Sequence, residues 1–292
     1  MKRSIGMRIP PNIGKEGLKS TAAWAAQNGL DVIDVPEYNE DVKQVLEAAG
    51  IKTGSIDGAG AVGPTKLLSE DKQRRREAVQ KVTNQIEEVA SLGGKVIFMC
   101  LIPEDITLTR KEGFDIWKES FPEVVQQAEK HDVYIALEGY PGPAPHYSTL
   151  GCTPEMLRAM IDIIPSRHFG INYDPSHLVR LGIDYLRFLS EFGDRINYCH
   201  GKDTEMLKEE LYEFGNLPAS FEQKIDFSEG SWRYTIPGEG DVDWGKVASR
   251  LEMIGYQGPI SIELEDHRYW GSLDAERQGI VKAKEHLKQY TN

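Results

Sequence analysis

Eight apolar segments rich in β-branched residues alternate with segments of helical periodicity, and this rhythm constrains the fold more than any other feature. The strand-like segments are KRSIGMRI (2–9), VIDVPE (32–37), IKTGSID (51–57), KVIFMCLI (95–102), VYIALEGY (133–140), HFGINYD (168–174), RINYCHGKD (195–203) and PISIELED (259–266). Strands that alternate with helices are typical of parallel βαβ units, and about eight such units favour a closed α/β barrel, the (β/α)8 TIM barrel. A doubly wound open sheet is the main alternative, but no Gly-rich phosphate loop opens the first helix, as a Rossmann fold would need.

The length of the chain fits one such barrel. Single α/β barrels commonly reach the 292 residues found here, so we expect one domain over residues 1–292. The one long interruption covers about residues 204–240, between the seventh strand and the helix that precedes the eighth. Loops of this length usually have a function, so we expect it to lie at the active-site face.

Charge and composition exclude several classes of partner. Lys and Arg number 34 against 46 Asp and Glu, for a net charge of −12, which disfavours a nucleic-acid partner. The first residues lack the apolar core of a signal peptide, and no apolar run approaches membrane-spanning length. The three cysteines are too few and too scattered for a disulfide framework or a cysteine zinc site. We therefore expect a cytoplasmic protein with no membrane partner.

Polar side chains recur at the ends of four successive predicted strands. Side chains alternate between the two faces of a strand, and the apolar face of a barrel strand packs on the helices. This alternation turns four polar residues inward: Glu138, Asp174, His200 and Glu263. All four lie at the C-terminal ends of their strands, where barrel enzymes carry their chemistry.

Three carboxylates and one imidazole would repel one another without a counter-charge. A divalent cation would supply it, and oxygen-rich ligation with a single nitrogen suits manganese, magnesium or cobalt better than a sulfur-rich zinc site. We predict one divalent cation, with Mn²⁺ first and Mg²⁺ or Co²⁺ as alternatives. The competing interpretation is a buried salt-bridge network around Lys202. Cys199 lies on the opposite strand face and is expected to be a core thiol.

Several motifs together resemble a known family. The segments ALEGY, NYDPSH, HGKDT, IPGEGDVDW (236–244) and SIELED resemble those of the xylose isomerase-like TIM barrels. That family includes enzymes described as sugar phosphate isomerases/epimerases, ketose 3-epimerases and inosose dehydratases. The resemblance implies that Glu138, Asp174, His200 and Glu263 are metal ligands. It also implies that His177 is the second histidine of the family, which contacts substrate or orients the aspartate.

The resemblance implies a reaction as well. A sugar isomerase or epimerase of this kind removes a proton next to a carbonyl and passes through an enediolate, with Glu138 and Glu263 as the acid–base pair. Ketose 3-epimerases usually carry an arginine shortly after the metal histidine, but HGKDTEMLKEEL has none, and Arg233 is the nearest candidate. The motif set also resembles relatives that act on 3-oxo sugars or cleave C-glycosides. A lyase, deglycosidase or dehydratase therefore stays as the alternative.

The remaining candidates would contact a sugar or oxidised-sugar substrate. The predicted substrate-binding residues are His177, Lys202, Arg233, Trp232 and His146. Trp232 would stack on a sugar face or anchor the long loop, and His146 would cover the substrate or face solvent. Two rival classes stay open: an endonuclease IV-like nuclease, disfavoured by seven histidines and the acidic charge, and a non-catalytic sugar-binding subunit. Whether the chain forms a homo-oligomer or joins a partner subunit also stays open.

Overall fold

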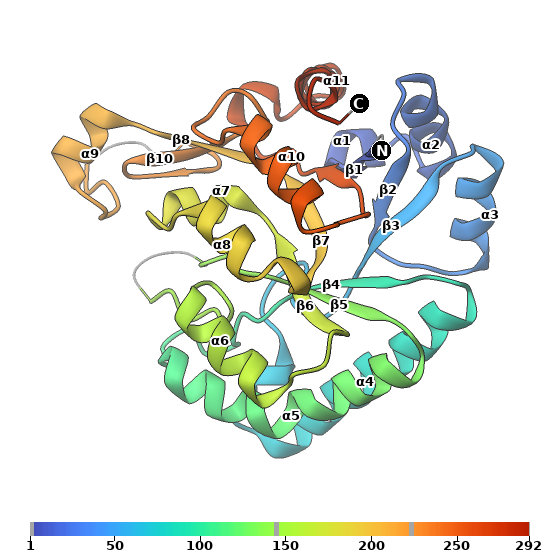
Figure 1. The fold of residues 1–292 in the computed structure, drawn as a ribbon, viewed down its shortest axis with the longest axis vertical. Helices are drawn as coiled ribbons and strands as arrows, with labels where there is room; N and C mark the ends of the chain where they lie inside the picture. Colours follow the sequence, from blue (N-terminus) through green and yellow to red (C-terminus); the bar gives the residue numbers. More distant parts are fainter. Residues whose placement is uncertain (1–2, 143–145, 222–224, 292) are drawn as a thin grey trace.

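Eight parallel strands form a closed barrel, which confirms the predicted TIM barrel (Figure 1). The computed structural model describes residues 3–142, 146–221 and 225–291. The barrel strands are β1 (Ile5–Arg8), β2 (Val32–Val35), β3 (Lys52–Asp57), β4 (Val96–Cys100), β5 (Tyr134–Glu138), β6 (Phe169–Tyr173), β7 (Ile196–Gly201) and β11 (Ile260–Ile262). Each falls within one of the eight strand-like segments of the sequence.

The barrel closes where the last strand joins the first. Strand β11 pairs in parallel with β1, with Ile5 opposite Ile260, and on its other side with β7, with His200 opposite Ser261. The full order around the barrel is β1-β11-β7-β6-β5-β4-β3-β2. Because all strands run in the same direction, their C-terminal ends form one rim, which we call the mouth.

Helices cover the outside of the barrel (Figure 1). They are α1 (Pro11–Gly14), α2 (Leu18–Gln27), α3 (Glu40–Ala48), α4 (Lys72–Ser91), α5 (Arg110–Lys130), α6 (Pro154–Ile163), α7 (Pro175–Arg180), α8 (Tyr185–Glu191), α10 (Trp244–Met253) and α11 (Leu273–Lys288). Local sequence signals fix where several begin. Asp71 accepts hydrogen bonds from two backbone N–H groups at the start of α4, and Thr109 and Glu112 form a capping box on α5. No helix in the described ranges is both long and apolar enough to cross a membrane.

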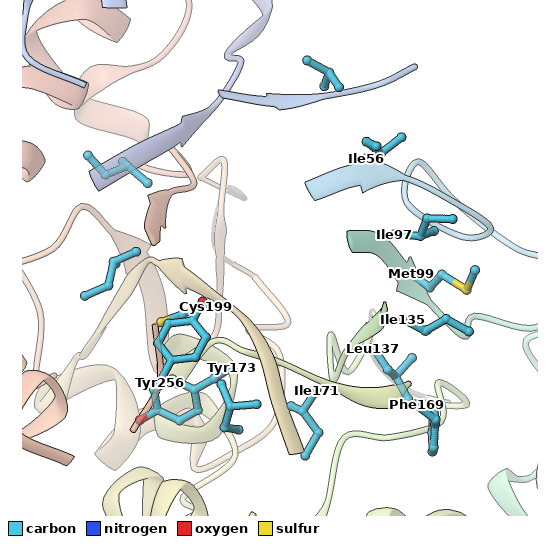
Figure 2. Packing of buried hydrophobic residues seen from close by; sticks show 14 of the residues in the cluster. Ile56, Ile97, Met99, Ile135, Leu137, Phe169, Ile171, Tyr173, Cys199 and Tyr256 are labelled. Carbon is cyan, nitrogen blue, oxygen red and sulfur yellow. The ribbon is translucent and has the colours of Figure 1, made fainter. Parts of the chain in front are cut away.

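The apolar core lies between the strands and these helices. Ile135 and Leu137 of β5, Ile171 of β6 and Cys199 of β7 all point into it (Figure 2). Their immediate neighbours therefore point to the inside of the barrel, as the alternation predicts. This confirms that Cys199 is a buried core thiol and leaves the inward positions to polar side chains.

The predicted loop at about 204–240 is an ordered arm rather than a loop without secondary structure. It contains β8 (Asp203–Met206), α9 (Lys208–Phe214), β9 (Ser228–Glu229) and β10 (Trp232–Thr235), and part of it lies outside the described residues. The three strands form an antiparallel sheet in the order β8-β10-β9. Figure 1 shows this arm extending sideways from the end of β7. Its strands are too short for their periodicity to show in the sequence.

Candidate active site

Four predicted side chains meet at the mouth of the barrel. Glu138 is the last residue of β5, Asp174 follows β6, His200 lies near the end of β7, and Glu263 follows β11. One ligand-type atom from each lies within 4.8 Å of the others. Residues that are up to 125 positions apart in the sequence therefore form one cluster, as the strand-end pattern predicts.

Asp174 has both a structural and a site-facing oxygen. Its Oδ1 accepts a hydrogen bond of 2.9 Å from the backbone N–H of Ser176 and so caps α7, with Pro175 in the first turn. Its Oδ2 lies 3.2 Å from the ammonium of Lys202. One carboxylate thus fixes the start of a helix and also supplies an anionic oxygen to the mouth.

Glu138 is held by three neighbours. Its Oε2 accepts a hydrogen bond of 2.5 Å from the Asn172 side chain and lies 2.8 Å from His200 Nδ1, while its Oε1 lies 3.3 Å from His177 Nε2. Burial and the charge of Glu263 would raise the pKa of Glu138, but the two histidines outweigh them and hold it well below its ordinary value. The carboxylate is therefore ionised at neutral pH.

A buried aspartate that the sequence analysis did not single out lies behind His200. His200 Nδ1 faces Glu138 and Glu263, whereas Nε2 lies 3.7 Å from Asp34 Oδ2. Asp34 in turn accepts hydrogen bonds from the hydroxyls of Tyr198 and Ser261. At 3.7 Å the aspartate and the imidazole attract each other through their charges without forming a hydrogen bond. A polar residue inside the apolar run VIDV was the signal available in the sequence.

Lys202 lies among the carboxylates, as the salt-bridge interpretation requires. Its Nζ is 2.5 Å from Glu263 Oε2, 3.1 Å from Glu265 Oε2 and 3.2 Å from Asp174 Oδ2. Burial lowers the pKa of Lys202, but these acidic neighbours together raise it well above its ordinary value. One ammonium nevertheless faces four carboxylates when Glu138 is included, so negative charge remains in excess.

His177 is tied to a tyrosine and an arginine. Its Nδ1 lies 2.7 Å from the hydroxyl of Tyr234, which accepts a hydrogen bond of 2.9 Å from Arg180 Nη1. Arginine has no acceptor, so the tyrosine proton is free to be donated to His177 Nδ1. We infer that the neutral ring carries its own proton on Nε2, because two carboxylates face that nitrogen, Glu138 at 3.3 Å and Asp174 at 3.5 Å, against one ammonium, that of Lys202 at 3.4 Å.

The hairpin of the arm divides the predicted substrate residues between two faces. Trp232 stacks on Arg180, with 3.9 Å between the guanidinium carbon and the ring centroid, and so faces the barrel together with Tyr234. Arg233 points to the other face and pairs with Glu205 of β8 at 2.6 Å. The role of Arg233 in gripping substrate stays a prediction, and its guanidinium is paired with Glu205 in this structure. Arg180, three residues after His177, is the arginine that reaches the site, and the sequence analysis missed it.

Two further motif residues lie away from the cluster. His146 is exposed on the segment between β5 and α6. Asp203 of the HGKD motif is structural: it accepts hydrogen bonds from the backbone N–H groups of Thr204, Gly238 and Val242 and from the indole of Trp244. Burial raises the pKa of Asp203 to about 6, although these hydrogen bonds lower it. Asp203 thus ties the HGKDT and IPGEGDVDW segments together.

The fold is a closed eight-stranded TIM barrel, and its candidate site consists of carboxylates and a histidine at the C-terminal ends of the strands. The chain belongs to the xylose isomerase-like TIM barrel family, whose model matches residues 16–290. This confirms the family predicted from the motifs.

Individual relatives agree with this assignment. The uncharacterized protein YfiH of Bacillus subtilis is 33% identical over 272 residues, covering 85% of this chain and 83% of that protein. An inosose dehydratase of Clostridium perfringens is 27% identical over 147 residues, about half of either chain (50% and 46%). Among solved structures, a D-tagatose 3-epimerase-like protein superposes with a TM-score of 0.68 at 22% identity, covering 99% of this chain and 97% of that one. This last likeness shows the fold.

Proposed function

We propose that this protein is a divalent-metal-dependent sugar isomerase or epimerase that transfers a proton next to a carbonyl. The observation that carries the proposal is the convergence of Glu138, Asp174, His200 and Glu263 within 4.8 Å at the mouth. The names of the relatives support the substrate class, because they include a sugar epimerase-like protein and a dehydratase of a cyclic polyol ketone.

The residues present fit a divalent cation. In the part of the chain that the structure describes, the buried Asp174 Oδ2 accepts no well-aligned hydrogen bond. The Lys202 ammonium lies 3.2 Å from this oxygen but is shared with Glu263 and Glu265, so Oδ2 keeps lone pairs for a cation. His200 Nδ1 points at two carboxylates, and the acidic residues outnumber Lys202. Three oxygen donors and one nitrogen favour manganese first, with magnesium or cobalt as alternatives.

In the proposed reaction Glu138 and Glu263 move the proton. When bound, the cation would polarise the carbonyl and the neighbouring hydroxyl of a sugar, which makes the hydrogen on the hydroxyl-bearing carbon more acidic. Glu138 extends from β5 and Glu263 from the end of β11, with His200 of β7 between those strands in the barrel. One carboxylate takes the proton from carbon and the other returns one. His177 Nε2–H and the Lys202 ammonium lie beside them to hold substrate oxygens.

The metal assignment is tested by elemental analysis. We expect the parent to retain about one equivalent of Mn²⁺ after dialysis, because each of the four residues contributes one donor atom. His200→Ala should lose it, whereas the control variant His286→Ala, changed on the outer helix α11, should not. Equal retention by the parent and His200→Ala would contradict the assignment.

The proton transfer is tested by exchange with deuterated solvent. The parent should exchange a carbon-bound proton of a ketose or 3-oxo sugar from a substrate panel. Glu138→Gln and Glu263→Gln keep an oxygen ligand but remove the base, so each should slow turnover about a hundred- to ten-thousand-fold while keeping much of the metal. Glu285→Gln on the surface is the control. Exchange at the parent rate in both site variants would exclude these two residues as the bases, whereas absence of exchange in the parent would favour a hydride shift or a sugar-binding role.

The relative named inosose dehydratase gives one specific reason to keep a second candidate, a dehydratase or lyase. Loss of a hydroxyl or an aglycone requires a proton donor for the leaving oxygen, a role open to the second carboxyl group of the Glu138 and Glu263 pair. Mass spectrometry of the product separates the two candidates, because isomerisation conserves mass whereas dehydration removes one water.

A further inference from the structure

A cavity of about 460 Å³ lies at the mouth beside the cluster, at the ends of the first three strands. Eight of its fourteen lining residues are Ile, Leu, Val or Pro. They come from the segments that follow β1, β2 and β3, from the end of β2 and from helices α1, α2 and α3. Leu18, Val35 and Val42 belong to this wall. Its volume falls within the range of about 300–1,000 Å³ that is usual for pockets of drug-sized ligands.

The cavity adjoins the cluster of Glu138, Asp174, His200 and Glu263 through Arg8. Arg8 lines it and places its Nε 3.5 Å from Glu263 Oε1. Both nitrogens of the Arg8 fork bond to the carboxylate of Asp57, at 2.6 and 2.8 Å, and Asp57 also lines the cavity. Arg8 and Asp57 are therefore already paired with each other, whereas the third charged residue away from the cluster, Glu37, lies at the exposed side of the cavity. A molecule held at Glu263 would extend past Arg8 into the apolar part.

The apolar wall is a poor environment for the sugar itself. Burying a hydroxyl against hydrocarbon without a hydrogen-bond partner costs about 1–3 kcal/mol of binding free energy, and a sugar carries several hydroxyls. Burying an apolar group against the same wall contributes roughly 0.8 kcal/mol of favourable binding free energy per CH₂. Polar chemistry at the cluster and an apolar cavity next to it together fit a molecule with one polar and one apolar half.

We propose that the cavity binds an apolar substituent, about the size of an aromatic ring or larger, attached to the sugar substrate. The inference rests on the proposed function and narrows its substrate class to sugar conjugates rather than free sugars. Arg8 and Asp57 mark the boundary between the halves, and Leu18 and Val42 contact the apolar half.

The test is calorimetric binding of phenyl β-D-glucoside and methyl β-D-glucoside, which needs no turnover. The parent should bind the phenyl compound at least about tenfold more tightly, because the ring is buried in the cavity. Leu18→Trp and Val42→Trp fill the cavity from two different helices and should each abolish that preference. Lys19→Trp places the same indole on an exposed neighbouring position of α2 and should preserve it.

Two results would overturn the proposal: equal or undetectable binding of the two glucosides by the parent, or a preference that survives in both Leu18→Trp and Val42→Trp when their melting temperatures show that they are folded. Failure of the proposed function looks different. In that case no sugar in the panel exchanges deuterium, while the phenyl preference and its loss in the cavity variants persist.

Discussion

At the scale of single residues, the most informative contact is between His177 and Tyr234. The second histidine of the family motif does not stand alone, because a hydroxyl from a hairpin of the arm fixes which of its nitrogens carries the proton. Arg180 completes the chain of hydrogen bonds and is itself buried, with its side chain 3% exposed. We therefore propose that Tyr234 is a positioning residue that acts through His177.

Removing that hydroxyl should impair turnover more than binding. In Tyr234→Phe the His177 Nδ1 loses its donor and both ring tautomers become populated. We expect kcat to fall about 10- to 100-fold, as for other residues that orient a site imidazole, with little change in KM or metal content. Nitrogen NMR of the imidazoles should show the change of tautomer. Tyr290→Phe, on the surface near the C-terminus, is the control, and an unchanged kcat in Tyr234→Phe would contradict the positioning role.

The sequence predicted the site residues at the ends of strands better than the residues that contact them from other elements. Glu138, Asp174, His200 and Glu263 could be found because period-two alternation assigns each a face and the strand order brings their ends together. Arg180 could not be found in this way, because its role depends on how the arm folds over α7. Asp174 is both a helix cap and a residue of the cluster, because its Oδ1 accepts the Ser176 N–H and its Oδ2 faces the Lys202 ammonium.

At the scale of elements, the hairpin of β8 and β10 decides on which side the predicted substrate residue Arg233 lies. Alternation places Trp232 and Tyr234 on one face of β10 and Arg233 on the other, and the pairing of Arg233 with Glu205 decides which face is which. Periodicity gives two faces but not their orientation when neither face is plainly apolar.

Variants of the hairpin should separate the two faces. Arg233→Ala removes a half-exposed ion pair worth about 1 kcal/mol or less, so kcat/KM should stay within about twofold of the parent. Trp232→Ala removes the ring that stacks on Arg180, a contact worth about 2 kcal/mol when desolvated, and should lower kcat/KM about tenfold or more. Steady-state kinetics on the best substrate of the panel would check both. The reverse order of effects would restore Arg233 as the substrate contact.

Helix α4 gives a pH-dependent prediction that is independent of the site. Backbone hydrogen bonds from Arg74 and Gln73 lower the pKa of Asp71 at the start of the helix. The stabilisation is therefore complete above the ordinary pKa of an aspartate and is lost as the pH falls through the lowered value. Asp71→Ala should lower the melting temperature at pH 7 and have less effect near pH 2.5, whereas Asp71→Asn should remain capped at both. Equal effects of Asp71→Ala at the two pH values would contradict this explanation.

At the scale of the whole molecule, a cation bound to residues of four strands should stabilise the complete barrel. At a free concentration a hundred times the Kd, it should add about 2.7 kcal/mol to the free energy of unfolding. Thermal unfolding with Mn²⁺ and with EDTA would measure this shift, and His200→Ala should abolish it. A shift of the same size in His200→Ala would place the stabilising ion elsewhere.

The closure of the barrel by β1 and β11 has a consequence for how the protein matures. Glu263 follows the final barrel strand, so the cluster is incomplete until the C-terminal part of the chain has been synthesised and has docked against the N-terminal strand. A nascent fragment that ends before β11 would lack Glu263, one of the four ligands of the proposed site, and should therefore bind a cation more weakly. Metal uptake should report the finished barrel, and a chain truncated before residue 259 should take up less metal however much of its secondary structure has formed.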